Sequence, residues 1–120
     1  MSVPALRYLY LMRRKAGTDT DAYVDYYFHH HSRFGFVTPG IAGYTQFHVD
    51  GTASSAAARE LGFGTHAVDS VSELHFHGLD AFFAGVADGR LGAEALADEE
   101  LFVDRDNSVS FCTRTVLPAV

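Results

Sequence analysis

The stretch LRYLYLM, residues 6–12, decides the fold. Two sets of hydrophobic side chains alternate along it: Tyr8, Tyr10 and Met12 in one set, and Leu9 and Leu11 in the other. Alternate residues of a β-strand point to opposite faces of the sheet, so both faces of this strand would be apolar. A strand of that kind is typical of the centre of a sheet that is covered on both sides. We therefore expect residues 6–12 to form a central strand.

Turn and periodicity signals place the other elements around this strand. They predict a helix that follows an N-cap at Thr18 and ends at about Val37, a strand at residues 41–49, a short helix at 54–61, a strand at 68–77, helical segments at 79–86 and 91–102, and a strand at 108–116. Without the short helix in the connection, the order is β-α-β-β-α-β. This order is typical of a ferredoxin-like α+β fold, in which an antiparallel four-stranded sheet carries its helices on one face. We expect a single domain over residues 1–120.

The second face of this sheet should be partly apolar. We expect it to carry Tyr8, Tyr10, Met12, Tyr44 and Val71. An apolar patch of that size has to be buried by something, and a second copy of the chain is the simplest partner. The pattern therefore predicts a homodimer through the open sheet face, which would be a dimeric α+β barrel.

Composition excludes several classes of protein. The formal net charge is −6 and the only basic cluster is Arg13-Arg14-Lys15, so a nucleic-acid partner is not expected. Cys112 is the one cysteine, the start of the sequence has no signal-peptide pattern, and no apolar run could span a membrane. These features favour a cytoplasmic protein without a membrane partner.

The chain contains seven histidines, three of them consecutive in DYYFHHHSRFG, residues 25–35. On a helical wheel the apolar stripe contains Tyr23, Tyr27, His30, Phe34 and Val37. We expect His30 to be packed, His31 to reach the rim of the sheet and His29 to be solvated. Adjacent residues of a helix do not face one another, so the triplet cannot form a metal site by itself.

A second group of ionisable residues lies on the strand expected at residues 68–77. Pairing with the preceding strand is expected to place Tyr44 opposite Glu73 and His48 opposite Asp69. A carboxylate in mid-strand is costly to bury alone, so Glu73 should either have a partner or a raised pKa. His75 and His77 share a face, and together with His31 they form an alternative metal-ligand set.

Four segments of the sequence resemble the EthD family, a branch of the dimeric α+β barrels. They are Tyr23-x-x-Tyr26-Tyr27-x-x-x-His31, Pro39-Gly40-Ile41-x-x-Tyr44, Asp69-x-Val71-x-Glu73-Leu74-His75-Phe76, and Leu96-Ala97-Asp98-Glu99 with Phe102-Val103-Asp104. The family often has tryptophan where Tyr27 and His75 stand. The resemblance implies a dimeric barrel, and related barrels include polyketide cyclases, isomerases, cofactor-free monooxygenases and members without known activity.

These observations favour a cofactor-free acid/base enzyme, which could be a cyclase, isomerase, dehydratase or oxygenase. Its substrate would be a hydrophobic carbonyl compound, lactone or polyketide-like molecule, and no cofactor or metal would be needed. In this hypothesis His31 is the acid or base, Glu73 and His75 share its proton, and Tyr44 orients the substrate. Further candidate substrate-binding residues are Tyr8, Tyr10, His48 and His66.

Two alternatives stay open from the sequence. One is a non-catalytic protein that binds a hydrophobic ligand or serves as an accessory protein of a degradation pathway. The other is a metal-dependent enzyme that uses His75, His77 and His31.

Overall fold

The structure, a computed structural model, describes residues 6–64, 67–86 and 89–114. Its strands are β1 (Leu6–Met12), β2 (Gly43–His48), β3 (Ser70–Phe76) and β4 (Val109–Thr113). Its helices are α1 (Thr20–Tyr26), α2 (Ser32–Val37), α3 (Gly51–Leu61), α4 (Leu79–Val86) and α5 (Gly89–Glu99). A π-helical turn, η1 (Tyr27–His31), joins α1 to α2, and a 3-10 turn, η2 (Arg105–Asn107), precedes β4. The expected order of strands and helices is confirmed.

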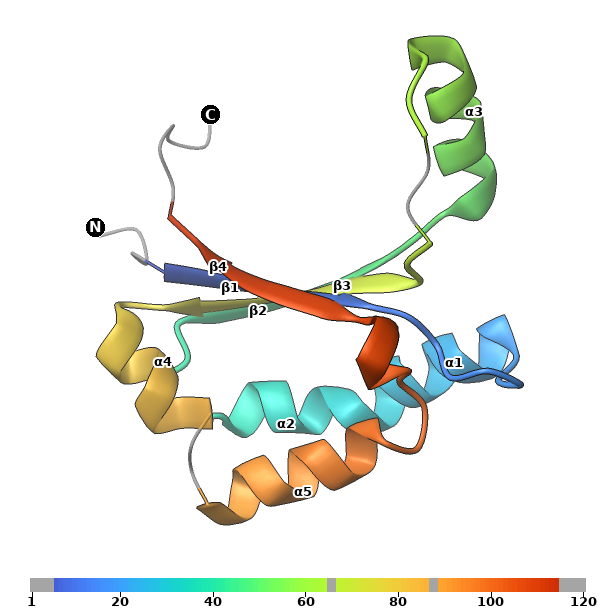
Figure 1. Cartoon of the computed structure of the whole chain (residues 1–120). Helices are drawn as coiled ribbons and strands as arrows, with labels where there is room; N and C mark the ends of the chain where they lie inside the picture. Colours follow the sequence, from blue (N-terminus) through green and yellow to red (C-terminus); the bar gives the residue numbers. More distant parts are fainter. Residues whose placement is uncertain (1–5, 65–66, 87–88, 115–120) are drawn as a thin grey trace.

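The four strands form one antiparallel sheet in the order β2-β3-β1-β4, with β1 inside the sheet as its two apolar faces predict. Helices α1, α2, α4 and α5 all lie on one side of the sheet (Figure 1). Helix α3 extends away on the other side and contains no buried residue (Figure 1). The ferredoxin-like class is confirmed. None of the helices in the described ranges combines the length and hydropathy that crossing a bilayer requires.

The covered face of the sheet is the one that carries Tyr8, Tyr10, Met12 and Tyr44, so our assignment of these four residues to the open face is wrong. Tyr44 pairs with Leu74, and Thr45 pairs with Glu73. The expected register was one residue out, and a slip of one residue moves every side chain to the opposite face. Because both faces of β1 are apolar, the alternation alone could not tell which face the helices cover.

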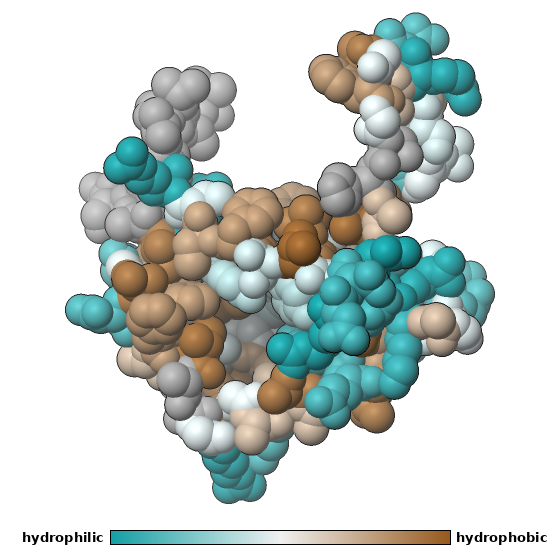
Figure 2. Space-filling model, viewed as in Figure 1, coloured by the Kyte–Doolittle hydropathy of each residue, from teal (hydrophilic) through white to brown (hydrophobic). Residues whose placement is uncertain are grey.

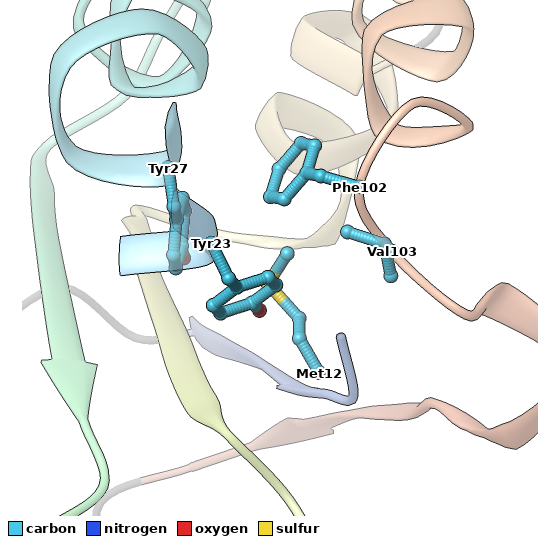
Figure 3. Packing of buried hydrophobic residues seen from close by; sticks show 5 residues of the cluster. All are labelled: Met12, Tyr23, Tyr27, Phe102 and Val103. Atoms are coloured by element: carbon cyan, nitrogen blue, oxygen red, sulfur yellow. The ribbon is translucent and has the colours of Figure 1, made fainter. Parts of the chain in front are cut away.

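A buried hydrophobic cluster between the sheet and the helices explains this choice of face. It contains Met12, Tyr23, Tyr27, Phe102 and Val103, each no more than 3% exposed (Figure 3). The Tyr23 and Ser70 hydroxyl oxygens lie 2.7 Å apart in a hydrogen bond beneath this cluster. Met12 therefore packs against the helix layer, and the residues that alternate with it on β1 face the open side.

The first helical segment departs from a regular α-helix at η1. Asp19, rather than the expected Thr18, caps its N-terminus by accepting from the backbone N–H of Ala22. The π-helical turn holds one more residue than an α-helical turn, which changes the residues that face the sheet. His31 is consequently buried, whereas His30 is exposed and stacks on Tyr26. Our expectation of a packed His30 is wrong, and that of a solvated His29 is confirmed.

Candidate functional site

A cavity of about 350 Å³ lies between the covered face of the sheet and the helices. The surface in Figure 2 is hollowed there, with hydrophobic residues along one side of the hollow and hydrophilic residues along the other. The rings that line the cavity belong to Tyr8, Tyr10, Tyr27, Phe34, Tyr44 and Phe82. The ionisable groups besides the tyrosines are His31, Glu99 and Arg105. A mostly apolar cavity with a few converging polar groups is typical of a small-molecule site.

His31 is fixed in this wall by Asp98, which is near the end of α5. The His31 Nδ1 atom lies 2.7 Å from Asp98 Oδ2, and the two residues are 8% and 7% exposed. Burial would raise the pKa of Asp98, but hydrogen bonds from Tyr26 and His31 and the nearby Arg33 hold it below its ordinary value. An ionised Asp98 can only accept, so the proton belongs on Nδ1 and the lone pair of neutral His31 is on Nε2.

Burial also lowers the pKa of His31, although the hydrogen bond to Asp98 opposes this change. The ring is therefore neutral at physiological pH. Its Nε2 atom points towards Glu99, whose Oε1 lies 3.8 Å away. A neutral imidazole with its second nitrogen held by a carboxylate is the arrangement that general bases use.

Glu99 was not singled out by the sequence. Its side chain is 17% exposed and lines the cavity, and its Oε2 lies 3.6 Å from Nε of Arg105. Burial raises the pKa of Glu99 to about 7; Arg105 opposes this change and Asp98 adds to it. In the sequence, Glu99 is the middle one of three consecutive acidic residues, Asp98-Glu99-Glu100, in the helical segment expected at residues 91–102. The only signal was its place in a segment that resembles the EthD family.

The hydroxyls of Tyr27 and Tyr44 are two of the polar groups in the cavity wall. The buried Tyr27 hydroxyl makes no hydrogen bond of ordinary length and angle to a described residue, although the Ser72 and Tyr44 hydroxyls are near enough to influence its pKa. The Tyr44 hydroxyl accepts from Nε2 of Gln46 at 2.7 Å. Burial raises the pKa of both phenols, so they stay neutral. An unpartnered buried hydroxyl at a cavity wall is available to a ligand oxygen.

Gly35 allows the Tyr44 ring to lie in this wall. A Cβ atom at position 35 would lie 1.7 Å from Cε2 of Tyr44, closer than any packed side chain can tolerate. The close approach of α2 to β2 at this point therefore depends on glycine. It sets the orientation in which Tyr44 presents its ring to the cavity.

Tyr8, Tyr10, Tyr44 and His31 are brought together by the fold, since all four line the cavity. Burial raises the pKa of Tyr10 to about 12, with a further contribution from Glu99, so this phenol is neutral too. His48 lies on the same sheet face but its Nε2 bonds to Oε1 of Gln46 at 3.0 Å, and it does not line the cavity. His66 lies outside the described residues.

Glu73 and His75 are on the opposite side of the sheet. Glu73 Oε1 lies 2.7 Å from Nε2 of His75 and 3.0 Å from Nη1 of Arg7. Glu73 therefore has the partners that its burial requires, but the expected pairing with Tyr44 is wrong because of the register. The geometry does not bring Glu73 and His75 together with His31.

The alternative metal set is not assembled either. His31 belongs to η1 and lines the cavity over the covered face of the sheet, His75 lies on the open face, and His77 is exposed beyond the end of β3. Within the described part of the chain, no three or more histidine, cysteine, aspartate or glutamate side chains are grouped in a way that could hold a metal ion.

The sequence matches the family profile of the EthD domain over residues 15–106. No functionally curated protein matches it at a significant level. Among solved structures, an EthD family protein from Bacillus halodurans is similar, with 11% identity and a TM-score of 0.69 over 93% of this chain and 99% of that one.

Two further structures share the fold. A dimeric ferredoxin-like protein of unknown function from Thermobifida fusca has 18% identity and a TM-score of 0.65, covering 92% of this chain and 91% of its own. SnoaB, a cofactor-independent oxygenase from Streptomyces nogalater, has 12% identity and a TM-score of 0.63, covering 98% of this chain and 100% of its own. At these identities the likeness concerns the fold, which hosts several chemistries.

Proposed function

The chain belongs to the EthD domain family, and on this basis we propose that it binds a hydrophobic carbonyl compound in the cavity and acts on it by cofactor-free acid/base chemistry. The observation that carries this proposal is the buried His31–Asp98 pair, which presents a neutral imidazole nitrogen to an apolar cavity. The fold-related oxygenase SnoaB supports the cofactor-free part, because it is described as cofactor-independent.

The polar and aromatic groups of the cavity wall have separate roles in this proposal. His31 removes or returns a proton, and Asp98 is a positioning residue that fixes its tautomer. Tyr27 and Tyr44 donate hydrogen bonds to the substrate carbonyl, since phenols with raised pKa values stay protonated. Tyr8 and Tyr10 provide ring faces for an apolar skeleton. A lactone or a polyketide-like ketone would suit these groups.

The active form in this proposal is a homodimer through the open sheet face. Leu9, Leu11 and Val71 lie there, and Phe47 and Phe111 on the same face are 49% and 46% exposed in one chain. Helix α3 extends on this side of the sheet (Figure 1). Two structures of the same fold are described as dimeric. Glu73, with Arg7 and His75, would then lie at the contact between the subunits.

Filling the cavity is expected to remove ligand binding. Ala95 lines the cavity, so Ala95→Phe should weaken binding of β-tetralone, a small hydrophobic ketone, by at least about tenfold, because the added ring takes the ligand's place. Titration of the isotope-labelled protein followed by NMR measures this. The matched control is Ala93→Phe, since Ala93 is exposed on the same helix.

The control variant should bind β-tetralone like the original protein, with the largest chemical-shift changes at Tyr27, His31 and Tyr44. Equal binding by both variants, or shift changes confined to the open sheet face, would contradict the proposed cavity. Binding without any turnover would favour the non-catalytic, ligand-binding alternative.

A further inference from the structure

We propose that His31 and Glu99 work as a pair, one removing a proton from a carbon beside a ketone while the other protonates the ketone oxygen. This inference rests on the proposed function and narrows it to proton relocation in enolisable ketones. It replaces Glu73, the carboxylate that the sequence suggested, with one that the fold places inside the cavity.

Each of the two side chains has one atom held by a neighbouring residue and one atom left free, and the two free atoms face each other. Asp98 binds Nδ1 of His31, which leaves Nε2 free. Arg105 approaches Oε2 of Glu99 at 3.6 Å, which leaves Oε1 free. Nε2 and Oε1 are 3.8 Å apart, too far for a direct hydrogen bond. A substrate carbon or oxygen can therefore contact either atom from the cavity.

Charged and titratable groups from several elements surround Glu99 and influence the pKa values of the pair. Glu99 is faced by His31 from η1, Arg105 from η2, Asp98 from its own helix, and Tyr8 and Tyr10 from β1. Burial lowers the pKa of His31 below its ordinary value and raises that of Glu99 to about 7, so a neutral imidazole lies beside a carboxyl group that is partly protonated near neutrality. A base and an acid that are both present at neutral pH suit general acid/base catalysis.

The step balances without any other reagent. Nε2 of His31 takes a proton from the carbon next to the carbonyl, and the electron pair of the C–H bond becomes the C=C bond of the enol. The carbonyl π electrons move to oxygen, which takes the proton of protonated Glu99. In the reverse direction, imidazolium His31 returns a proton to carbon and Glu99 recovers its own from oxygen. No net oxidation occurs, and Tyr27 remains a neutral donor throughout.

Exchange of the benzylic α-protons of β-tetralone in deuterated buffer, followed by proton NMR, tests the pair. The intact protein should accelerate exchange over buffer. His31→Gln and Glu99→Gln should each reduce that acceleration by roughly 10²–10⁴-fold, and the double variant should be no worse than the poorer single variant. Glu99→Asp, which keeps a carboxyl group, should retain more activity than Glu99→Gln.

Glu94→Gln is the matched control, because Glu94 lies on the same helix with a side chain 52% exposed and pairs with Arg90. It should leave exchange unchanged. If Glu99→Gln keeps more than half of the acceleration, the pair is refuted while the cavity and His31 stand. If β-tetralone binds but neither the intact protein nor any variant accelerates exchange, the pair is refuted and only the ligand-binding cavity remains. Failure of the unsubstituted protein to bind β-tetralone, in the titration that also tests Ala95→Phe, contradicts the proposed function itself.

Discussion

Leu11→Glu is expected to convert the proposed dimer into monomers. Leu11 lies on the open face between Val71 on β3 and Val109 on β4. A two-fold axis through this face would bury two carboxylates among apolar side chains, at a cost of several kcal/mol per unpaired charge. Since about 1.4 kcal/mol corresponds to a factor of ten, the dimer dissociation constant should rise by at least roughly 10³-fold. Sedimentation velocity over a range of concentrations measures it.

Leu101→Glu provides the matched control. Leu101 follows α5 and is 65% exposed, so the same substitution there should leave the dimer intact. An original protein that sediments as a monomer at micromolar concentration would contradict the proposed interface. So would a Leu11→Glu variant that remains as dimeric as the control.

Glu99→Gln is expected to stabilise the folded chain at alkaline pH and not at acidic pH. Burial raises the pKa of Glu99 to about 7 from its ordinary value of 4.5. Between these values the folded chain binds more protons than the unfolded chain, so its stability falls as pH rises, and the loss is complete above the folded pKa. Glutamine carries no charge and avoids this loss. The expected gain above about pH 8 is on the order of 3 kcal/mol.

Urea unfolding of both proteins at about pH 4 and about pH 8 measures this difference. His31 has the opposite dependence, because its lowered pKa makes stability fall as pH decreases through its unfolded value; both proteins keep His31, so its effect cancels in the comparison. Glu100→Gln, at the exposed neighbouring position, should change stability little at either pH. A Glu99→Gln variant with the same stability difference at both pH values would show that Glu99 is solvated.

Local patterns predicted the elements of this fold well. The alternation in residues 6–12 identified the inner strand, and Pro39-Gly40 marked the end of the helical segment at Val37. Such features depend on neighbours in the chain, which the sequence displays directly. The choice of face did not follow, because β1 is apolar on both sides and the register error of one residue placed Tyr44 on the same face as Val71 and Glu73.

The site could be predicted only in part, because it depends on which residues the fold buries and brings together. His31 was distinguished from His30 by the family resemblance, whereas the helical wheel favoured His30; the π-helical turn buries His31 instead. Glu73 looked like the buried carboxylate of the site, but the register places it on the open face with Arg7. Glu99 was not proposed as a site residue, because its burial depends on contacts with η1 and β1 that are distant in sequence.

The protonation state of the His31 ring tests most directly the proposal that His31 is the base of the site. Long-range proton–nitrogen NMR spectra of isotope-labelled protein measure this state, and the His31→Gln variant assigns the signals. At about pH 7.5 we expect a neutral ring with the proton on Nδ1, donated to Asp98, and a bare Nε2 facing the cavity. A ring protonated on Nε2, or an imidazolium at that pH, would contradict the claim that His31 offers a base to the cavity.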